Sequence, residues 1–152
     1  LFDESARVPM IHKVPGKNSD VCDNFTELLD LSTTISDLCG LVFPSRLQGY
    51  SLTKNLDDPS HSVRDAAFCV NGNSFLIRTK KWAYIQHAED ASKGIQLFDM
   101  EKDPKQFTNL SKNPEYKKVV DHLKAKLATK LKEVRDTDIE KERLKKKARR
   151  KP

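Results

Sequence analysis

In residues 97–110 the chain reads Leu97-Phe98-Asp99-Met100-Glu101-Lys102-Asp103-Pro104-Lys105-Gln106-Phe107-Thr108-Asn109-Leu110. Leu97 and Phe98 are typical of the end of a half-buried strand. Asp103-Pro104 favours a turn, because proline fixes its own φ and biases the preceding residue away from the helical region. The stretch therefore predicts a strand that enters an acidic turn just before a helix.

The helix that follows has a clear start and one apolar face. Asn113-Pro114-Glu115 supplies a cap, a first-turn proline and an acidic N-terminus. Each buried Leu or Val on such a face is worth about 1.5–3 kcal/mol, so we expect it to pack on a sheet. The face consists of Tyr116, Val119, Val120, Leu123, Leu127, Leu131 and Val134.

Four short apolar runs before this turn predict three or four antiparallel strands in a meander. They cover residues 66–70, 75–79, 82–86 and 95–98. The connections are Asn71-Gly72-Asn73, Lys80-Lys81 and a loop over 89–94. Residues 66–134 are therefore predicted to form a subdomain of one antiparallel sheet and one long helix.

Residues 1–50 suggest a different architecture. An apolar run over 7–14, closed by Pro15-Gly16, is typical of a buried strand. Asp23 or Asn24 is expected to cap a helix over 25–39 that ends at Gly40. A strand and a helix alone leave apolar faces uncovered, so we expect them to complete a larger sheet upstream. The apolar helix face consists of Leu28, Leu29, Leu31, Ile35 and Leu38.

The predicted fold class is thus α/β with α+β: the last strand and helix of a large α/β domain over 1–50, a linker over 51–65, and the small antiparallel sheet packed on a long C-terminal helix over 66–134. The net charge of +6 lies mainly in a tail, because residues 135–152 hold nine Lys or Arg against four Asp or Glu. Such a tail could bind nucleic acid or another anionic polymer. Its lack of aromatic residues favours a solvated, disordered end instead.

The cysteines predict no metal site. Cys22, Cys39 and Cys69 match no zinc or redox spacing. We expect Cys39 to be a small buried hydrophobe at the end of the helix face. Cys22 could pair with Cys69, or with an upstream residue, if the protein is exported. The chain opens on Leu1 without an initiator Met, so we expect it to be part of a longer protein.

Six phrases in a fixed order carry a family resemblance over roughly residues 1–134. Besides the run at 97–110 they are Arg7-Val8-Pro9-Met10-Ile11-His12-Lys13-Val14-Pro15-Gly16, Glu27-Leu28-Leu29-Asp30-Leu31, Leu38-Cys39-Gly40, Leu47-Gln48-Gly49-Tyr50-Ser51-Leu52 and Ile77-Arg78-Thr79-Lys80-Lys81-Trp82-Ala83-Tyr84-Ile85. This series resembles the C-terminal portion of the formylglycine-dependent sulfatases, in the alkaline-phosphatase-like superfamily. It is most similar to the iduronate-2-sulfatase-like branch.

The resemblance implies a full-length enzyme that hydrolyses sulfate esters of a polysaccharide or glycosaminoglycan, with formylglycine and Ca²⁺ at its active site. We expect neither to be held by this segment. Val42-Phe43-Pro44-Ser45-Arg46 has the x-Pro-x-Arg frame but carries Val where Cys or Ser is required. The resemblance also places a catalytic Lys shortly before Leu1. We therefore assign no catalytic or metal-binding residue here, and expect the segment alone to release no sulfate.

The resemblance further implies that loops of this subdomain lean over the catalytic cleft. We predict Asn71, Asn73 and His87 as substrate-binding residues, because they lie in a turn and at the start of a polar loop. The turn is shorter than its counterpart in iduronate-2-sulfatase, which argues against assuming heparan or dermatan specificity. Arg78 is expected to form a structural ion pair, and Trp82 to be a packed ring.

The implied partners are the upstream catalytic domain of the same chain and a sulfated glycan, with no membrane and no nucleic acid. The implied location is periplasmic or secreted, or lysosomal in a eukaryote. Two alternatives stay open. One is a stand-alone module that binds anionic polymer through its basic tail, and the other is a phosphodiesterase or phosphatase of the same superfamily.

Overall fold

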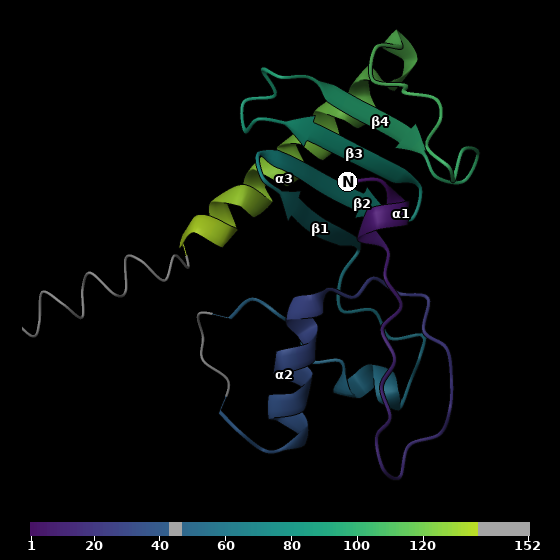
Figure 1. The fold of residues 1–152 in the computed structure, drawn as a ribbon, viewed down its shortest axis with the longest axis vertical. Helices are drawn as coiled ribbons and strands as arrows, with labels where there is room; N and C mark the ends of the chain where they lie inside the picture. Colours follow the sequence, from purple (N-terminus) through teal and green to yellow (C-terminus); the bar gives the residue numbers. More distant parts are fainter. Residues whose placement is uncertain (43–46, 137–152) are drawn as a thin grey trace, which may run out of the picture.

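The computed structural model describes residues 1–42 and 47–136 (Figure 1). Most of the predicted basic tail, from 137 on, lies outside the described residues, as do residues 43–46 of the x-Pro-x-Arg frame. Within the described residues, no helix is long and apolar enough to cross a membrane.

A four-stranded antiparallel sheet lies at the centre of the residues 66–136. Its strands are β1 (Ala66–Asn71), β2 (Ser74–Thr79), β3 (Trp82–His87) and β4 (Ile95–Asp99), paired in the order β1-β2-β3-β4. Gly72, with φ of +57°, supplies the positive φ that a two-residue hairpin turn requires. The predicted meander is confirmed, with each strand within one or two residues of its expected bounds.

The long helix covers one face of this sheet, as predicted. Asn113 caps a short 3-10 turn, Pro114–Tyr116, and its side chain accepts a hydrogen bond of 3.0 Å from the Glu115 N–H. The helix α3 (Lys117–Asp136) continues from it and lies behind the sheet in Figure 1. The buried core between them consists of Phe75, Ile77, Tyr84, Leu97, Val120, Leu123 and Leu127.

The N-terminal helix α1 (Asp3–Ala6) lies on the opposite face of the sheet (Figure 1). Successive strand residues point to opposite faces, so Leu76, Ile85 and Phe98 form a second apolar cluster there. The rings of Phe2 and Phe98 lie 5.6 Å apart. The Arg78 Nε donates a hydrogen bond of 3.0 Å to the carboxylate of Asp3, which confirms the structural ion pair expected at Arg78.

The second long helix, α2 (Leu28–Leu38), lies below the sheet in Figure 1, beside a short 3-10 helix (Thr53–Leu56). Its position and its end are as expected, since Gly40 has φ of +63°. Its cap is not. Glu27 caps the helix in a reciprocal capping box with Asp30. The side chain of Asn24 is engaged elsewhere, donating to the carbonyls of Pro59 and His61 at 3.1 and 2.9 Å.

One prediction for this region is wrong. Residues 7–14 form no strand, and Ile11 is 92% exposed. A strand needs a neighbour, and in the described part of the chain the four strands pair only with one another. The apolar face of α2 is uncovered in this chain, with Leu28 77% exposed, as expected for a helix that lacks an upstream sheet. Asp30 and Thr34 of the same helix are buried.

One of the cysteines also differs from expectation. Cys39 is exposed rather than buried, because it ends the uncovered face of α2. Cys22 and Cys69 are both free.

Candidate functional site

The three predicted substrate-binding residues lie at one end of the sheet. Asn71 is the last residue of β1, Asn73 lies in the turn before β2, and His87 is the last residue of β3. Strand pairing sets Asn71 opposite Ser74, and Ser74 opposite His87. The structure therefore brings the predicted residues into one row, with Ser74, which the sequence analysis missed, between them.

The imidazole of His87 is held in place by its neighbour. The Ser74 Oγ lies 2.8 Å from the His87 Nδ1, within hydrogen-bond distance. Among the described residues, His87 is contacted through Nδ1 and its backbone, which leaves Nε2 available to a ligand. The ring is half-buried, so one edge faces solvent.

The loop over residues 88–94 is anchored from several sides. The Ala88 N–H donates a hydrogen bond of 2.8 Å to the carbonyl of Asn73, which joins the loop to the β1–β2 turn. Gln86, only 2% exposed, donates through Nε2 to the carbonyls of Ala88 and Glu89 at 3.0 and 2.6 Å. Ala88 has φ of +64°, a left-handed conformation that these contacts maintain.

Two further contacts fix this loop. Glu89 forms an ion pair with Arg135 of α3. Hydrogen bonds from the backbone and side chain of Ser92 hold the pKa of Asp90 below its usual range. The loop is therefore a defined surface next to His87, and the carboxylate of Asp90 stays ionised at neutral pH.

The row at the sheet end can recognise a polar ligand, but it lacks a complete catalytic set. Two amides and an imidazole offer donors and acceptors to hydroxyl or sulfate oxygens. A Ser–His contact resembles part of a nucleophile–base pair, yet such a pair needs a third group to orient the imidazole. Among the described residues, no carboxylate is bonded to His87.

No metal site is built by the described ranges 1–42 and 47–136, where no group of three or more His, Cys, Asp or Glu is placed to hold an ion. The x-Pro-x-Arg frame begins with the apolar Val42. The donors that a formylglycine or a calcium site requires are thus not supplied by these residues, and no chemical step through either group can be assigned to them.

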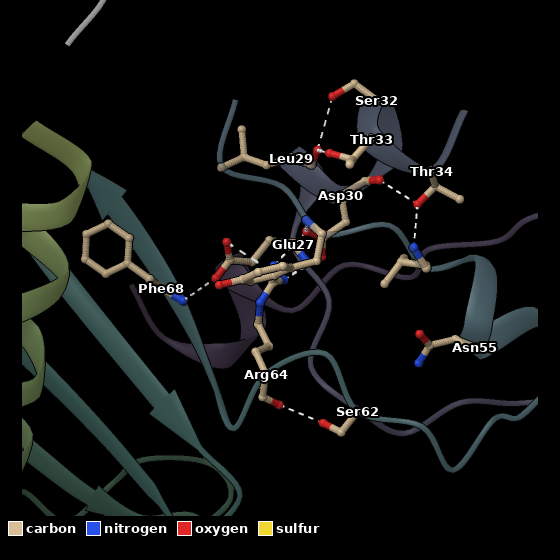
Figure 2. Close-up of polar contacts among 12 residues, drawn as sticks. Glu27, Leu29, Asp30, Ser32, Thr33, Thr34, Asn55, Ser62, Arg64 and Phe68 are labelled. Atoms are coloured by element: carbon tan, nitrogen blue, oxygen red, sulfur yellow. Dashed lines mark hydrogen bonds and ion pairs between the residues drawn. The ribbon is translucent and has the colours of Figure 1, made fainter. Parts of the chain in front are cut away.

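A second polar assembly, shown in Figure 2, joins α2 to the sheet. Asp30 is fully buried, and its carboxylate accepts hydrogen bonds from both terminal nitrogens of Arg64, at 2.5 and 2.6 Å. It also accepts hydrogen bonds from the backbone N–H groups of Glu27 and Tyr50, at 2.7 and 2.8 Å. The carboxylate of Glu27 in turn accepts the N–H of Phe68 in β1 at 2.8 Å.

This junction was missed by the sequence analysis, which placed residue 64 in a linker. The signal available was Asp30 itself, an acidic residue between Leu29 and Leu31. Such a residue is buried only when its charge is matched. Because Asp30 and Arg64 neutralise each other within the fold, we interpret the junction as structural rather than as a ligand site.

Comparison with known proteins points in one direction. Residues 1–133 match the family described as N-sulphoglucosamine sulphohydrolase, C-terminal. Human arylsulfatase K is 32% identical over 125 residues, which are 73% of this chain and 23% of that protein. A delta 4,5-hexuronate-2-O-sulfatase of Bacteroides thetaiotaomicron is 30% identical over 133 residues, 79% of this chain and 27% of that protein.

Solved structures agree with the sequence matches. One protein, solved in complex with its substrate D-glucosamine-2-N,6-O-disulfate, aligns with a TM-score of 0.61 and 26% identity. The alignment covers 72% of this chain and 24% of that protein. The chain therefore spans about a quarter of the length of the relatives that it matches.

Proposed function

We propose a function from one premise: the chain belongs to the sulfatase family, through the region described as N-sulphoglucosamine sulphohydrolase, C-terminal, which residues 1–133 match. It is the C-terminal part of a sulfatase that hydrolyses sulfate esters of a polysaccharide or glycosaminoglycan. The observation that carries this proposal is the length of the match, which includes the sheet, α3 and the segment that leads into them.

The chemistry belongs to the upstream part of the longer protein. The described residues hold neither a metal-binding group nor a nucleophile with its base. Formylglycine and Ca²⁺ are therefore proposed for the upstream catalytic domain, which is the partner of this segment. The exposed apolar face of α2 supports such a partner, because a face of this kind is normally covered.

We assign substrate contact to the sheet end. Asn71, Asn73 and His87 lie in one row beside an anchored loop, which supports a role in orienting the sugar rather than in bond cleavage. The division of the chain into 1–50, 51–65, 66–134 and a tail over 135–152 stays part of the proposal. The iduronate-2-sulfatase-like branch does too, and the name of the hexuronate-2-O-sulfatase relative favours it.

The proposed location is periplasmic or secreted, or lysosomal in a eukaryote, which suits a polymeric substrate. A basic-tail module is not retained as a second function, because residues 137–152 lie outside the family match.

The first test is to read the coding region upstream of Leu1 in frame. A longer chain that carries Cys/Ser-x-Pro-x-Arg, with a Lys shortly before Leu1, supports the proposal. The absence of that motif from the longer frame overturns it.

The second test measures sulfate release by the longer protein from an unsaturated 2-O-sulfated uronate disaccharide. His87→Ala should raise KM several-fold while kcat changes little, because the residue binds rather than reacts. His12→Ala is the matched control, since residue 12 lies in the segment over 7–23, which leads away from the sheet (Figure 1). A loss of kcat with unchanged KM would contradict the assigned role of His87.

A further inference from the structure

A cavity of about 780 Å³ lies at the other end of the sheet from His87. It opens between the β2–β3 turn, the first half of α3 and the 60–65 segment. Its wall includes Lys80, Lys81, Trp82, Lys118, His122 and Lys126. Because β3 runs from Trp82 to His87, the cavity and the sheet end are separated by about 17 Å along this strand, at 3.3 Å per residue.

The lining of this cavity is strongly cationic. Of the described residues that line it, Asp65 alone is acidic. Asp65 is already paired with Lys126, whose hydrogen bond lowers the pKa of that carboxyl. Arg64 is occupied by Asp30, and Lys81 lies 3.2 Å from Glu101. Within residues 1–42 and 47–136, neither Lys80 nor Lys118 forms an ion pair, so two ammonium groups remain available to an anion.

An aromatic wall lies beside these charges. Trp82 is half-buried and its ring meets that of Tyr116 edge-on, with the centroids 5.6 Å apart. Phe25 and Val119 add apolar surface to the same cavity. An indole ring packs well against the C–H face of a pyranose, and an apolar wall with a few convergent polar groups is typical of small-molecule sites.

We propose that this cavity is a second saccharide site, which binds one anionic sugar unit of the polymer. The sulfate or carboxylate of that unit is held by the ammonium groups of Lys80 and Lys118, and its ring lies against Trp82. The proposal rests on the proposed function only for the choice of a sulfated saccharide. Chemistry at the sulfate ester is not part of it, because the cavity holds no nucleophile–base pair.

Trp82 is the only tryptophan of the chain, so its fluorescence reports on this cavity alone. The whole chain, residues 1–152, would be titrated with a heparin hexasaccharide while iodide quenching of Trp82 is recorded. Iodide is an anion that the cationic cavity concentrates. We expect the hexasaccharide to reduce iodide quenching, and an uncharged dextran oligosaccharide of the same size to leave it unchanged.

Two double variants distinguish binding in the cavity from nonspecific electrostatic binding elsewhere on the chain. Lys80→Gln/Lys118→Gln should weaken hexasaccharide binding about five- to tenfold, the effect of losing two exposed charge pairs. Lys102→Gln/Lys105→Gln removes the same charge from an exposed loop after β4 and keeps the tail, so its affinity should match the unmodified chain. Circular dichroism would verify that both variants fold.

Three outcomes would overturn the proposal. They are equal losses in both variants, no loss in the first variant, or calorimetric binding without any change at Trp82, which would place the ligand elsewhere on the chain. None of these outcomes bears on sulfate release by the longer protein, so failure of the cavity and failure of the proposed function are distinguishable.

Discussion

Among single residues, Asp30 and Arg64 form a buried ion pair, because the aspartate is fully buried and the arginine side chain is only 7% exposed. Removing one partner of a buried pair leaves an uncompensated charge, which costs about 3–5 kcal/mol. We expect Arg64→Met to lower the free energy of unfolding by about that amount, measured by urea denaturation of the whole chain.

Lys126→Met is the matched control for this variant. It breaks the pair with Asp65, whose side chain is 82% exposed, and exposed pairs contribute about 0–1 kcal/mol. Similar losses in the two variants would show that Asp30 is not buried as described.

Gly49 lies where no side chain fits. A Cβ at this position would overlap the backbone of Leu29 and the hydroxyl of Thr33 in α2. Gly49→Ala should therefore cost about 1–3 kcal/mol, as overpacking does. Gly16→Ala, with φ of +77° and open space around it, should cost only about 1 kcal/mol from backbone strain. Thermal unfolding of the two variants compares them, and a Gly49→Ala chain as stable as the parent would refute the close approach.

Ionisation of Tyr84 is expected to destabilise the fold at alkaline pH. Burial raises its pKa to about 12 from an ordinary value near 10. Because the pKa of Tyr84 is raised in the folded state, its contribution to the free energy of unfolding is fully present below pH 10. That contribution is lost as the pH rises from 10 toward 12. Absorbance titration should show one of the three tyrosines ionising late, and Tyr84→Phe should remove that late step. A normal titration for all three would show that the Tyr84 ring is accessible to water.

At the scale of helices and strands, the sheet and α3 could be predicted because their signals are local. The Asn71-Gly72-Asn73 turn and the proline after Asn113 mark boundaries that short-range chemistry alone determines. The apolar face of α2 was predicted as well, but what covers it could not be, because the partner of an apolar stripe is decided by tertiary structure. Arg64 was missed for the same reason, since its partner Asp30 is 34 residues away in sequence.

A pair of leucines tests this difference between the two helices. Leu127 of α3 is fully buried and Leu28 of α2 is 77% exposed. We expect Leu127→Ala to cost about 2–5 kcal/mol, through lost burial and the cavity left behind. Leu28→Ala should stay within about 0.5 kcal/mol in this chain. Urea denaturation decides the matter, and a large loss at Leu28 would mean that its side chain is covered after all.

For the molecule as a whole, protection of the backbone amides from hydrogen exchange should be unequal along the chain. The sheet and α3 share a continuous core, whereas residues 7–23 form no helix or strand. Native-state amide exchange should therefore be slowest in β2, β3 and the middle of α3, and fast over 7–23, where few amides are hydrogen-bonded. Uniform protection over residues 1–134 would contradict this division.

The strand order has a kinetic consequence as well. Each strand pairs with its neighbour in sequence, through connections of two, two and seven residues. Such a low contact order favours fast folding, because little loop-closure entropy is lost before a native contact forms. The contact of Asp3 with Gln106 closes a loop of 103 residues, so α1 is expected to dock after the transition state. Changes in α1 would then speed unfolding and leave the folding rate unchanged.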